Sequence, residues 1–367
     1  MPRRRSFHTS FSLLFLVTAL LGPLVASSSA SADERDAARP VHRLLPAPDG
    51  DVVPAVLGAP VPAMSPFGAP LSARPAAPST AARSWYVSKL SGSLRADVDL
   101  ATAKGCAQSR TAAPGLVTLG FGRQTVGGVT AFNRRRPTPL DHVVAIAAGF
   151  AAGLERCGTR PGQWTLLLAV SNYGGITSSN GANGGAAWAL VVEVAALMSV
   201  PNSHVTIGGG IDMEPGWGPP QQGRAWVDGY VRATDRLLVN FGSADLCSRK
   251  PGRRACANGW TQDDVIHVST AAGPSVWVAP EVYDHKGIMA GQWANIARRA
   301  TELGTPLRFA GVMTQQAACA GSTEKACITM NLSPAEAWTT LVRLLDAARA
   351  DRVGPFLSTD IGWGWNG

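Results

Sequence analysis

The sequence VTIGGGIDME, residues 205–214, predicts a buried strand that ends in two acids. Side chains alternate between the two faces of a strand, so the apolar odd positions form one face. The even positions form the other face, where small residues come first and Asp212 and Glu214 come last. In a (β/α)8 barrel such a face points into the interior, and its carboxyl end opens into the mouth that holds the chemistry. This stretch therefore predicts a barrel strand with two acids at the mouth.

The rest of the chain repeats strand-like runs alternating with helix-like segments. The other predicted strands are Ser84–Leu90, Leu116–Gly122, Trp164–Asn172, Leu237–Gly242, Ser275–Tyr283, Leu307–Thr314 and Gly354–Ile361. The predicted helices include Leu140–Arg156, Ala186–Met198, Arg224–Arg236, Gly291–Leu303 and Ala335–Ala350. Eight such units favour the α/β class and a closed (β/α)8 barrel. The alternative is a doubly wound open sheet, which normally has fewer strands.

Alternation predicts two more acids at the same mouth. In the run 275–283, Trp277, Glu281 and Tyr283 share the inward face, and in the run 354–361 Ser358 and Asp360 do so, with Ile361 pointing outward. Glu214, Asp212, Glu281 and Asp360 are the candidate catalytic residues. Aromatic and amide side chains near strand ends are candidates for contacts with a sugar, namely Gln124, Tyr173, Trp217, Tyr283, Gln316 and Trp363.

A purely structural role for these acids is the alternative. They would then fill the top of the barrel through hydrogen bonds or ion pairs with cations such as Lys89 or Arg123. The functional hypothesis rests on the position of the acids, because like charges crowded in a partly buried mouth raise one pKa and so supply a proton donor.

The amino-terminal region predicts export. Three arginines, an apolar run over residues 11–25 and a small-residue site before Asp33 indicate a signal peptide over residues 1–32, either an ordinary one or a twin-arginine one. Residues 33–83 are rich in Ala and Pro and predict a disordered spacer, which leaves residues 84–367 for the barrel domain. We expect a secreted or cell-wall-associated monomer with no membrane contact after cleavage of the signal.

Charge and cysteine content narrow the classes of partner. Removal of the three signal arginines lowers the formal charge from +8 to +5, without the clustered basic face and interleaved aromatics of a nucleic-acid-binding protein. The spacing of the six cysteines suggests the pairs Cys106–Cys157, Cys247–Cys256 and Cys319–Cys327, as expected in an oxidising compartment. The scattered His and Cys residues predict neither a metal site nor a cofactor.

The stretch 209–214, GGIDME, resembles the Asp-x-Glu strand of glycoside hydrolase families 18 and 25, the chitinases and one class of muramidases. The resemblance implies that Glu214 is the proton donor and that Asp212 orients the N-acetyl group of the substrate. Asp360 is similar to a late-strand aspartate of some muramidases. The chain departs from the chitinase pattern at Ile207 and Gly210, where that family has aspartates, and from the muramidase pattern on the first strand.

We therefore expect a secreted glycoside hydrolase that acts on a polysaccharide, with an N-acetylhexosamine polymer such as peptidoglycan as the first candidate. Glu214 and Glu281 belong to predicted strands that are two apart in the order, which places their carboxyls roughly 5–9 Å apart and leaves retaining and inverting mechanisms both open. The alternatives are a non-catalytic carbohydrate-binding barrel and a wall-associated structural protein in which the spacer matters most.

Overall fold

The computed structural model describes residues 81–88, 90–131, 137–158, 162–174, 176, 181–199, 204–354 and 357–365. All of these belong to one unit, residues 63–367. The predicted signal peptide and nearly all of the predicted spacer lie outside the described residues, so both stay predictions.

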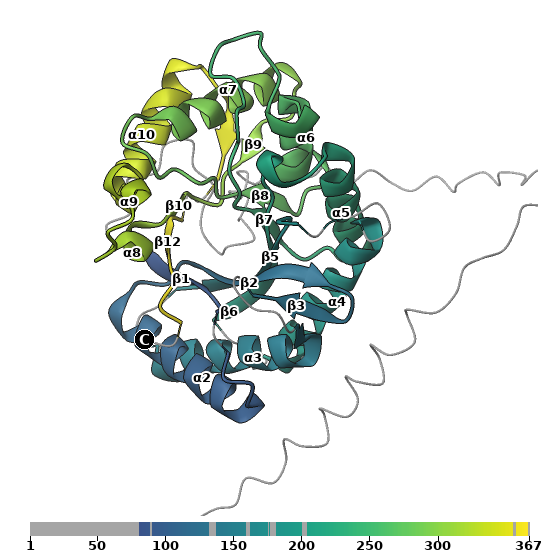
Figure 1. Cartoon of the computed structure of the whole chain (residues 1–367), viewed down its shortest axis with the longest axis vertical. Coiled ribbons are helices and arrows are strands. Elements are labelled where there is room, and N and C mark those ends of the chain that lie inside the picture. Colours follow the sequence, from purple (N-terminus) through teal and green to yellow (C-terminus); the bar gives the residue numbers. More distant parts are fainter. Residues whose placement is uncertain are drawn as a thin grey trace, which may run out of the picture. The chain divides into compact units, whose positions relative to one another are not determined.

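A curled parallel sheet forms the centre of the unit, with helices around it (Figure 1). Eight parallel strands follow the order β10-β12-β1-β2-β5-β6-β7-β8. Their bounds are β1 (Ala82–Tyr86), β2 (Leu116–Thr125), β5 (Trp164–Ser171), β6 (Val205–Asp212), β7 (Leu238–Asn240), β8 (Val276–Val278), β10 (Met313–Thr314) and β12 (Thr359–Gly362). The α/β class and the parallel order of the predicted strands are confirmed.

The two ends of this sheet, β8 and β10, are not joined by a ladder. Among the described residues, only the isolated parallel bridges Val278–Phe309 and Glu281–Met313 link β8 and its extension to the next segment. The sheet is therefore curled like a barrel without the continuous closure of a full (β/α)8 barrel. Short additional strands lie off the main path, β3 (Gly128–Thr130) and β4 (Thr138–Pro139) beside β2, and β9 (Leu307–Arg308) paired with β11 (Arg352–Val353).

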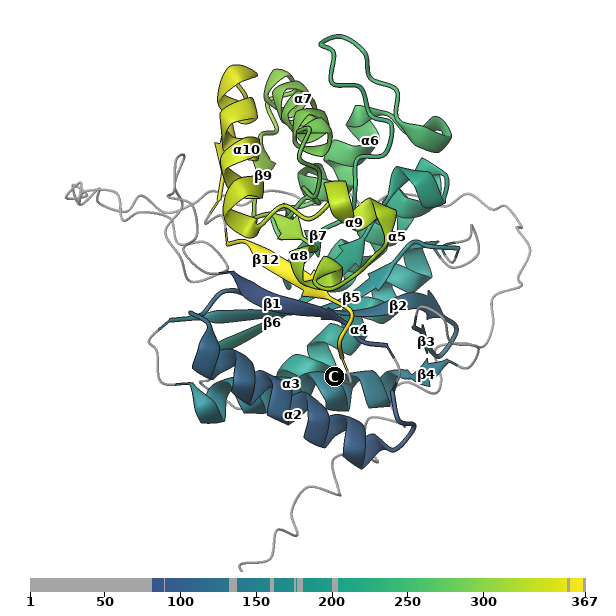
Figure 2. The ribbon, with the colours of Figure 1, turned by 60° about the vertical axis from the view of Figure 1, so that its left-hand side comes forward.

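Helices lie on the outside of the curled sheet, with α2 and α3 on one side and α7 and α10 on the other (Figure 2). Their bounds are α2 (Leu94–Thr111), α3 (Leu140–Cys157), α4 (Gly181–Met198), α5 (Pro220–Ala233), α6 (Gln262–Ile266), α7 (Ile288–Glu302), α8 (Gln316–Cys319), α9 (Lys325–Thr329) and α10 (Pro334–Ala347). The five predicted helices correspond to α3, α4, α5, α7 and α10. Helix α10 begins with a capping box, in which the Ser333 hydroxyl accepts from the Glu336 N–H and the Glu336 carboxylate accepts from the Ser333 N–H.

Helix α4 is the one described helix that is long and apolar enough to cross a membrane. It packs against α5 and β6, and its Trp188, Val191, Val192 and Ala195 are buried. The Trp188 indole N–H donates to the Leu168 carbonyl of β5 at 3.0 Å. Its apolar composition is that of a helix packed into the core of this fold.

The predicted phase of β6 is confirmed by what surrounds its glycines. A Cβ on Gly210 would lie 2.8 Å from the Ala169 Cβ and 3.2 Å from the Phe241 ring, and both of these side chains belong to the apolar cluster inside the sheet. A Cβ on Gly209 would instead meet the Tyr230 hydroxyl of α5 at 2.6 Å. The even positions of β6 therefore face inward, and they are small because the interior and the neighbouring strands leave no room.

The phase of β12 is the reverse of the prediction. Ile361, predicted to point outward, belongs to the interior apolar cluster, which also contains Trp277, Ala279 and Tyr283 as predicted for β8. Asp360 accordingly points to the other side. The apolar odd positions of this run were predicted to face the helices, but Leu357 and Ile361 both border the interior cluster, so the apolar face of this segment points inward.

The three predicted disulfides are confirmed. They join Cys106 of α2 to Cys157 of α3, Cys247 to Cys256 within the loop after β7, and Cys319 to Cys327 between α8 and α9. Disulfides of this number indicate an oxidising compartment, in agreement with an exported protein.

Candidate acid site

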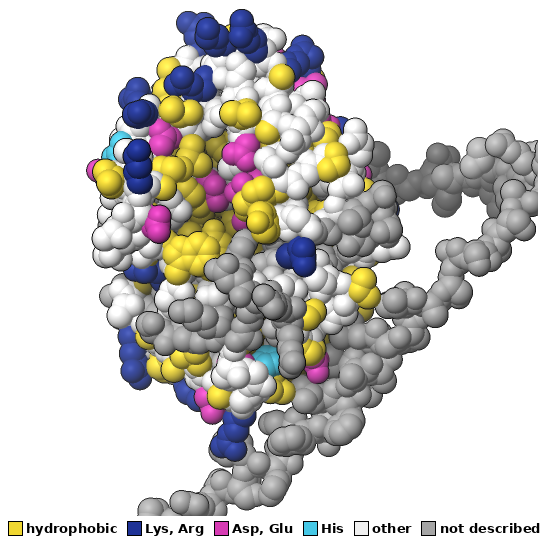
Figure 3. Space-filling view, viewed as in Figure 1, with side chains coloured by type: hydrophobic (Ala, Val, Ile, Leu, Met, Phe, Trp, Pro, Cys, Tyr) yellow, Lys and Arg dark blue, Asp and Glu magenta, His cyan; other side chains and the backbone are white. Residues whose placement is uncertain are grey.

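Four carboxyl groups meet at the carboxyl ends of β6, β7 and β8, and we call Asp212, Glu214, Asp245 and Glu281 the acid cluster. Asp212 is the last residue of β6, Glu214 follows it by two residues, and Glu281 follows β8 by three. One carboxylate oxygen from each of these three residues lies within 4.8 Å of the other two. Figure 3 shows acidic side chains gathered near the middle of this face and bordered by hydrophobic ones. Three of the four predicted catalytic acids, those predicted from the alternation along β6 and β8, therefore lie together in the structure.

Asn172 and Asn240 fix the backbone that carries Asp212 and Glu214. The Asn172 side chain accepts from the Glu214 N–H at 2.9 Å and donates to the Glu214 carbonyl at 2.9 Å. The buried Asn240 side chain accepts from the Met213 N–H at 3.3 Å. Because these amides replace the ladder bonds that β6 lacks beyond residue 212, the strand direction continues through Glu214.

Asp245 is the member of the acid cluster that alternation did not identify. It lies in the loop after β7, where the chain has left the strand and side-chain parity no longer applies. One carboxylate oxygen accepts from the Gly216 N–H at 3.1 Å, and the carboxyl group is also hydrogen-bonded to Glu214. Two carboxyl groups can share a hydrogen bond only if one of them carries a proton. The available sequence signal was an acid five residues after the end of β7.

Burial and the neighbouring charges raise the pKa values of Asp212, Glu214 and Glu281. Glu214 has a pKa raised to about 11, first by burial and then by the charges of Glu281, Asp212 and Asp245. Burial raises the pKa of Glu281 to about 8, against the lowering effect of a hydrogen bond from Tyr283. The pKa of Asp212 is raised well above its ordinary value, mainly by burial. Glu214 and Glu281 therefore hold protons at neutral pH.

Tyr86 and Tyr283 lie beside the acid cluster, where they contribute aromatic rings and hydroxyl groups. The Tyr283 hydroxyl donates to a Glu281 carboxylate oxygen at 2.7 Å, and Tyr86 is hydrogen-bonded to Tyr283. Burial raises the pKa of both hydroxyls well above the ordinary tyrosine value, so both stay protonated donors. Tyr86, at the end of β1, was not identified from the sequence, although its place at a strand end is the signal that identified Tyr283.

No cation neutralises these acids within the described residues. None of the four has an ion-pair partner there, and Arg123, a predicted partner, donates instead to the Gly174 carbonyl at 3.1 Å. Lys89, the other predicted partner, lies outside the described residues. The Asp212 Oδ1 atom is buried and has no hydrogen-bond partner there. Three oxygens this close could also hold a hard divalent cation, since such ions prefer carboxylate ligands.

Asp360 does not join the acid cluster. Its carboxylate accepts from the Ala317 N–H at 3.0 Å and from the Thr314 hydroxyl at 3.0 Å, which caps the amino end of α8. Gln316 is the exposed first residue of that helix. The reversed phase of β12 thus gives Asp360 a structural contact at the outer side of the sheet.

Three predicted aromatic side chains lie where they present ring surface. Tyr173 and Trp363 are 54% and 49% exposed, and Trp363 stacks on Tyr86 with ring centroids 4.3 Å apart. Trp217 packs edge-on against Tyr173 at 5.3 Å. Gln124, another predicted sugar contact, donates to the Gly184 carbonyl and accepts from the Trp226 indole N–H. Both ends of its amide are therefore hydrogen-bonded within the protein.

Compared with models of known protein families and with curated protein sequences, the chain matches none of them.

Proposed function

We propose that this protein is a secreted glycoside hydrolase and that Glu214 is its proton donor. The observation that carries the proposal is the convergence of Asp212, Glu214 and Glu281 within 4.8 Å at the ends of parallel strands. Glycosidic cleavage requires a protonated acid at the leaving oxygen and a second group at the anomeric carbon. A Glu214 whose pKa is raised to about 11 carries its proton at neutral pH, which suits the first role.

The proposed reaction uses one proton and one water. Glu214 gives its proton to the glycosidic oxygen as the bond from that oxygen to the anomeric carbon breaks, and the leaving sugar departs as an alcohol. The positive charge that develops on the ring is stabilised by the second group. Water then adds to the anomeric carbon and returns a proton to Glu214, which completes the hydrolysis.

The closeness of the acids favours a retaining or substrate-assisted course. An inverting pair leaves about 6.5–9.5 Å between its carboxyls to admit a water, whereas a retaining pair is about 5–5.5 Å apart. The three oxygens within 4.8 Å agree with the shorter spacing. We assign the second role to the ionised form of Glu281, which a pKa of about 8 leaves as roughly a tenth of the molecules at pH 7, or to an N-acetyl group of the substrate oriented by Asp212. An N-acetylhexosamine polymer such as peptidoglycan is therefore the proposed substrate.

Exposed aromatic rings near the cluster support a sugar ligand. Tyr173, Trp217 and Trp363 offer apolar faces to the C–H side of a pyranose, and Tyr283 offers a hydroxyl. In this proposal the scaffold is a variant (β/α)8 barrel. Its last gap is spanned by two isolated bridges instead of a continuous ladder. The proposed location is outside the cell, on or near the wall.

The test is the release of reducing sugar from peptidoglycan, chitin and a panel of other polysaccharides. General acid catalysis contributes about 10²–10⁴-fold, so Glu214→Gln should lower the rate by that factor. Glu324→Gln, which removes an exposed carboxylate elsewhere, should leave the rate unchanged. Thermal unfolding of each variant shows that the fold is intact.

Two outcomes would overturn the proposal. One is hydrolysis at an unchanged rate in Glu214→Gln. The other is binding of a polysaccharide with no turnover by the unaltered protein, equal in Glu214→Gln, which is the behaviour of a non-catalytic carbohydrate-binding barrel.

A further inference from the structure

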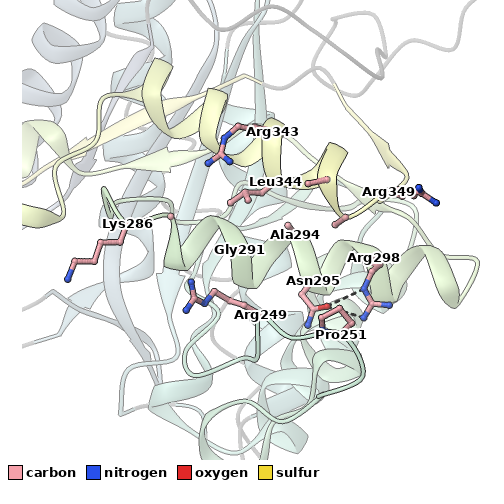
Figure 4. A pocket seen from close by; sticks show the side chains of 13 residues that line it. Arg249, Pro251, Lys286, Gly291, Ala294, Asn295, Arg298, Arg343, Leu344 and Arg349 are labelled. Carbon is pink, nitrogen blue, oxygen red and sulfur yellow. Dashed lines mark hydrogen bonds between the residues drawn. The ribbon is translucent and has the colours of Figure 1, made fainter.

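A second region of the protein carries the opposite charge. Thirteen residues of α7, α10 and the neighbouring loops line a cavity of about 480 Å³, and we call it the basic groove (Figure 4). Five of the lining residues are cationic and none is acidic or aromatic; the cations are Arg249, Lys286, Arg298, Arg343 and Arg349. The space-filling view shows basic side chains gathered at the end of the face where α7 and α10 lie, away from the central acids (Figure 3).

Small residues make the hollow between the two helices. Gly291 and Ala294 of α7 face Ala347 and Ala348 at the end of α10 across the groove. A Cβ on Gly291 would lie 3.0 Å from the Arg249 Cδ, so the aliphatic part of Arg249 lies across this glycine. The groove is thus a feature of the helix packing, with cationic side chains placed around it.

The loop that carries Arg249 is held in place. The Asn295 amide of α7 donates to the Ser248 carbonyl at 2.6 Å and to the Lys250 carbonyl at 3.2 Å, on either side of Arg249. Gln262 also donates to the Ser248 carbonyl, at 3.1 Å. The disulfide between residues 247 and 256 closes the same loop. Less conformational entropy is therefore lost when a ligand engages Arg249.

Most of the positive charge in the groove is uncompensated. Arg298 is paired with Glu302 and contacts the Asn295 side chain. For Arg249, Lys286, Arg343 and Arg349 no ion pair exists within the described residues. The nearby carboxylates are engaged elsewhere, since Asp346 pairs with Arg352 at 2.6 Å and Asp284 accepts from the first N–H groups of α7. An anionic ligand would relieve the repulsion among these four cations.

We propose that the basic groove binds a polymer with repeated phosphate groups. The guanidinium group matches phosphate oxygens in a bidentate geometry, and three of the four uncompensated cations are arginines. In Figure 4, Lys286 and Arg349 lie toward opposite ends of the groove, so the charge is spread along it as an extended anion requires. The absence of an aromatic lining residue argues against single-stranded nucleic acid, whose binding sites stack bases on aromatic rings.

The test measures binding of fluorescein-labelled linear polyphosphate by fluorescence anisotropy at about 0.1 M salt. The double variant Arg343→Glu/Arg349→Glu should weaken binding at least tenfold, and Arg249→Glu/Lys286→Glu should do the same from the other side of the groove. The matched control is Arg95→Glu/Arg232→Glu, which changes net charge equally at exposed arginines on α2 and α5 and should change affinity less than threefold. Affinity should fall as salt increases.

Three results would overturn the proposal: no polyphosphate binding by the unaltered protein, equal losses in the control and groove variants, or tighter binding of single-stranded DNA than of polyphosphate. Inorganic phosphate is the competitor that separates a single phosphate site from a polymer site, because the proposal requires the polymer to bind much more tightly per molecule. Thermal unfolding shows that each variant is folded.

Discussion

The acid cluster and the basic groove place charge in opposite ways. Glu214 and Glu281 follow the ends of buried strands, where burial makes ionisation costly, so they hold protons at neutral pH. The cations of the groove lie on helices and loops, and four of the five are exposed to water. A buried group changes its protonation state to suit its surroundings, whereas an exposed group attracts a counter-ion. The first arrangement suits proton transfer and the second suits binding.

The largest expected difference between the two regions is in pH dependence. The raised pKa of Glu281 means that its contribution to stability is complete below about pH 4.5 and is lost as pH rises through about 8. At pH 9, Glu281→Gln should therefore be more stable than the unaltered protein by up to about 5 kcal/mol, since one pKa unit corresponds to about 1.4 kcal/mol. At pH 4 the two should be equal.

Urea unfolding at both pH values measures this difference, with Glu324→Gln as the control at an exposed position. Equal stabilities of Glu281→Gln and the unaltered protein at pH 9 would mean that Glu281 is not held protonated by its surroundings. The double variant Arg343→Glu/Arg349→Glu should leave the shape of the pH profile unchanged, because no buried ionisable group is altered.

The next effect concerns the loop that supplies Asp245 to the acid cluster and Arg249 to the basic groove. Cys247→Ser/Cys256→Ser should destabilise the protein by about 2–3 kcal/mol, and it should lower both polysaccharide hydrolysis and polyphosphate affinity. Cys319→Ser/Cys327→Ser opens a loop of similar length and should cost about the same stability. Chemical unfolding measures the stability of both variants, and the hydrolysis and binding assays measure their two functions. If Cys247→Ser/Cys256→Ser lost neither function, a shared role for the loop would be contradicted.

Glycine substitutions should distinguish the rigid surroundings of the cluster from the adaptable surroundings of the groove. Gly210→Ala brings a methyl group against Ala169 in the packed interior and should cost about 2 kcal/mol. Gly291→Ala meets the flexible side chain of Arg249, and the gain in helix propensity, up to about 1 kcal/mol, should offset the contact. Denaturant midpoints of the two variants test the contrast, and equal losses would show that the groove is packed as tightly as the interior.

The smallest effect is expected for a single cation of the groove. Arg343→Ala removes an exposed side chain without an ion pair in the described part of the chain, so stability should change by no more than about 0.5 kcal/mol. The same change should weaken polyphosphate binding measurably at low salt. A destabilisation well above that size, measured by urea unfolding, would mean that Arg343 has a structural role.

Regular strands were the part of this fold that the sequence predicted best. Along β6 the alternation is uninterrupted, and its phase carried through Glu214 because Asn172 and Asn240 extend the strand direction. The same argument failed at β12, where the alternation holds but the apolar positions face the interior, so Asp360 was assigned to the wrong face. Helix α2, whose apolar periodicity is weak, was not predicted at all.

Loops account for the rest of what was missed. Asp245 reaches the acid cluster from the irregular segment between β7 and the disulfide-closed loop, and no periodic pattern encodes that position. The basic groove was missed for a related reason, because its cations come from residues 249, 286, 298, 343 and 349 and are adjacent only after folding. The net charge of the chain gave no sign that these residues would gather.

The closed loop between residues 247 and 256 has a consequence for the two regions together. The covalent ring carries Arg249 of the basic groove, and Asp245 of the acid cluster lies two residues before it, where its carbonyl accepts from the Ala257 N–H at 2.9 Å. If occupancy of either region shifts this ring, thermodynamic reciprocity requires that each ligand alters the affinity of the other by the same factor. Under the two proposals, a polyphosphate bound in the basic groove would then change the affinity of the acid cluster for its sugar ligand by that factor.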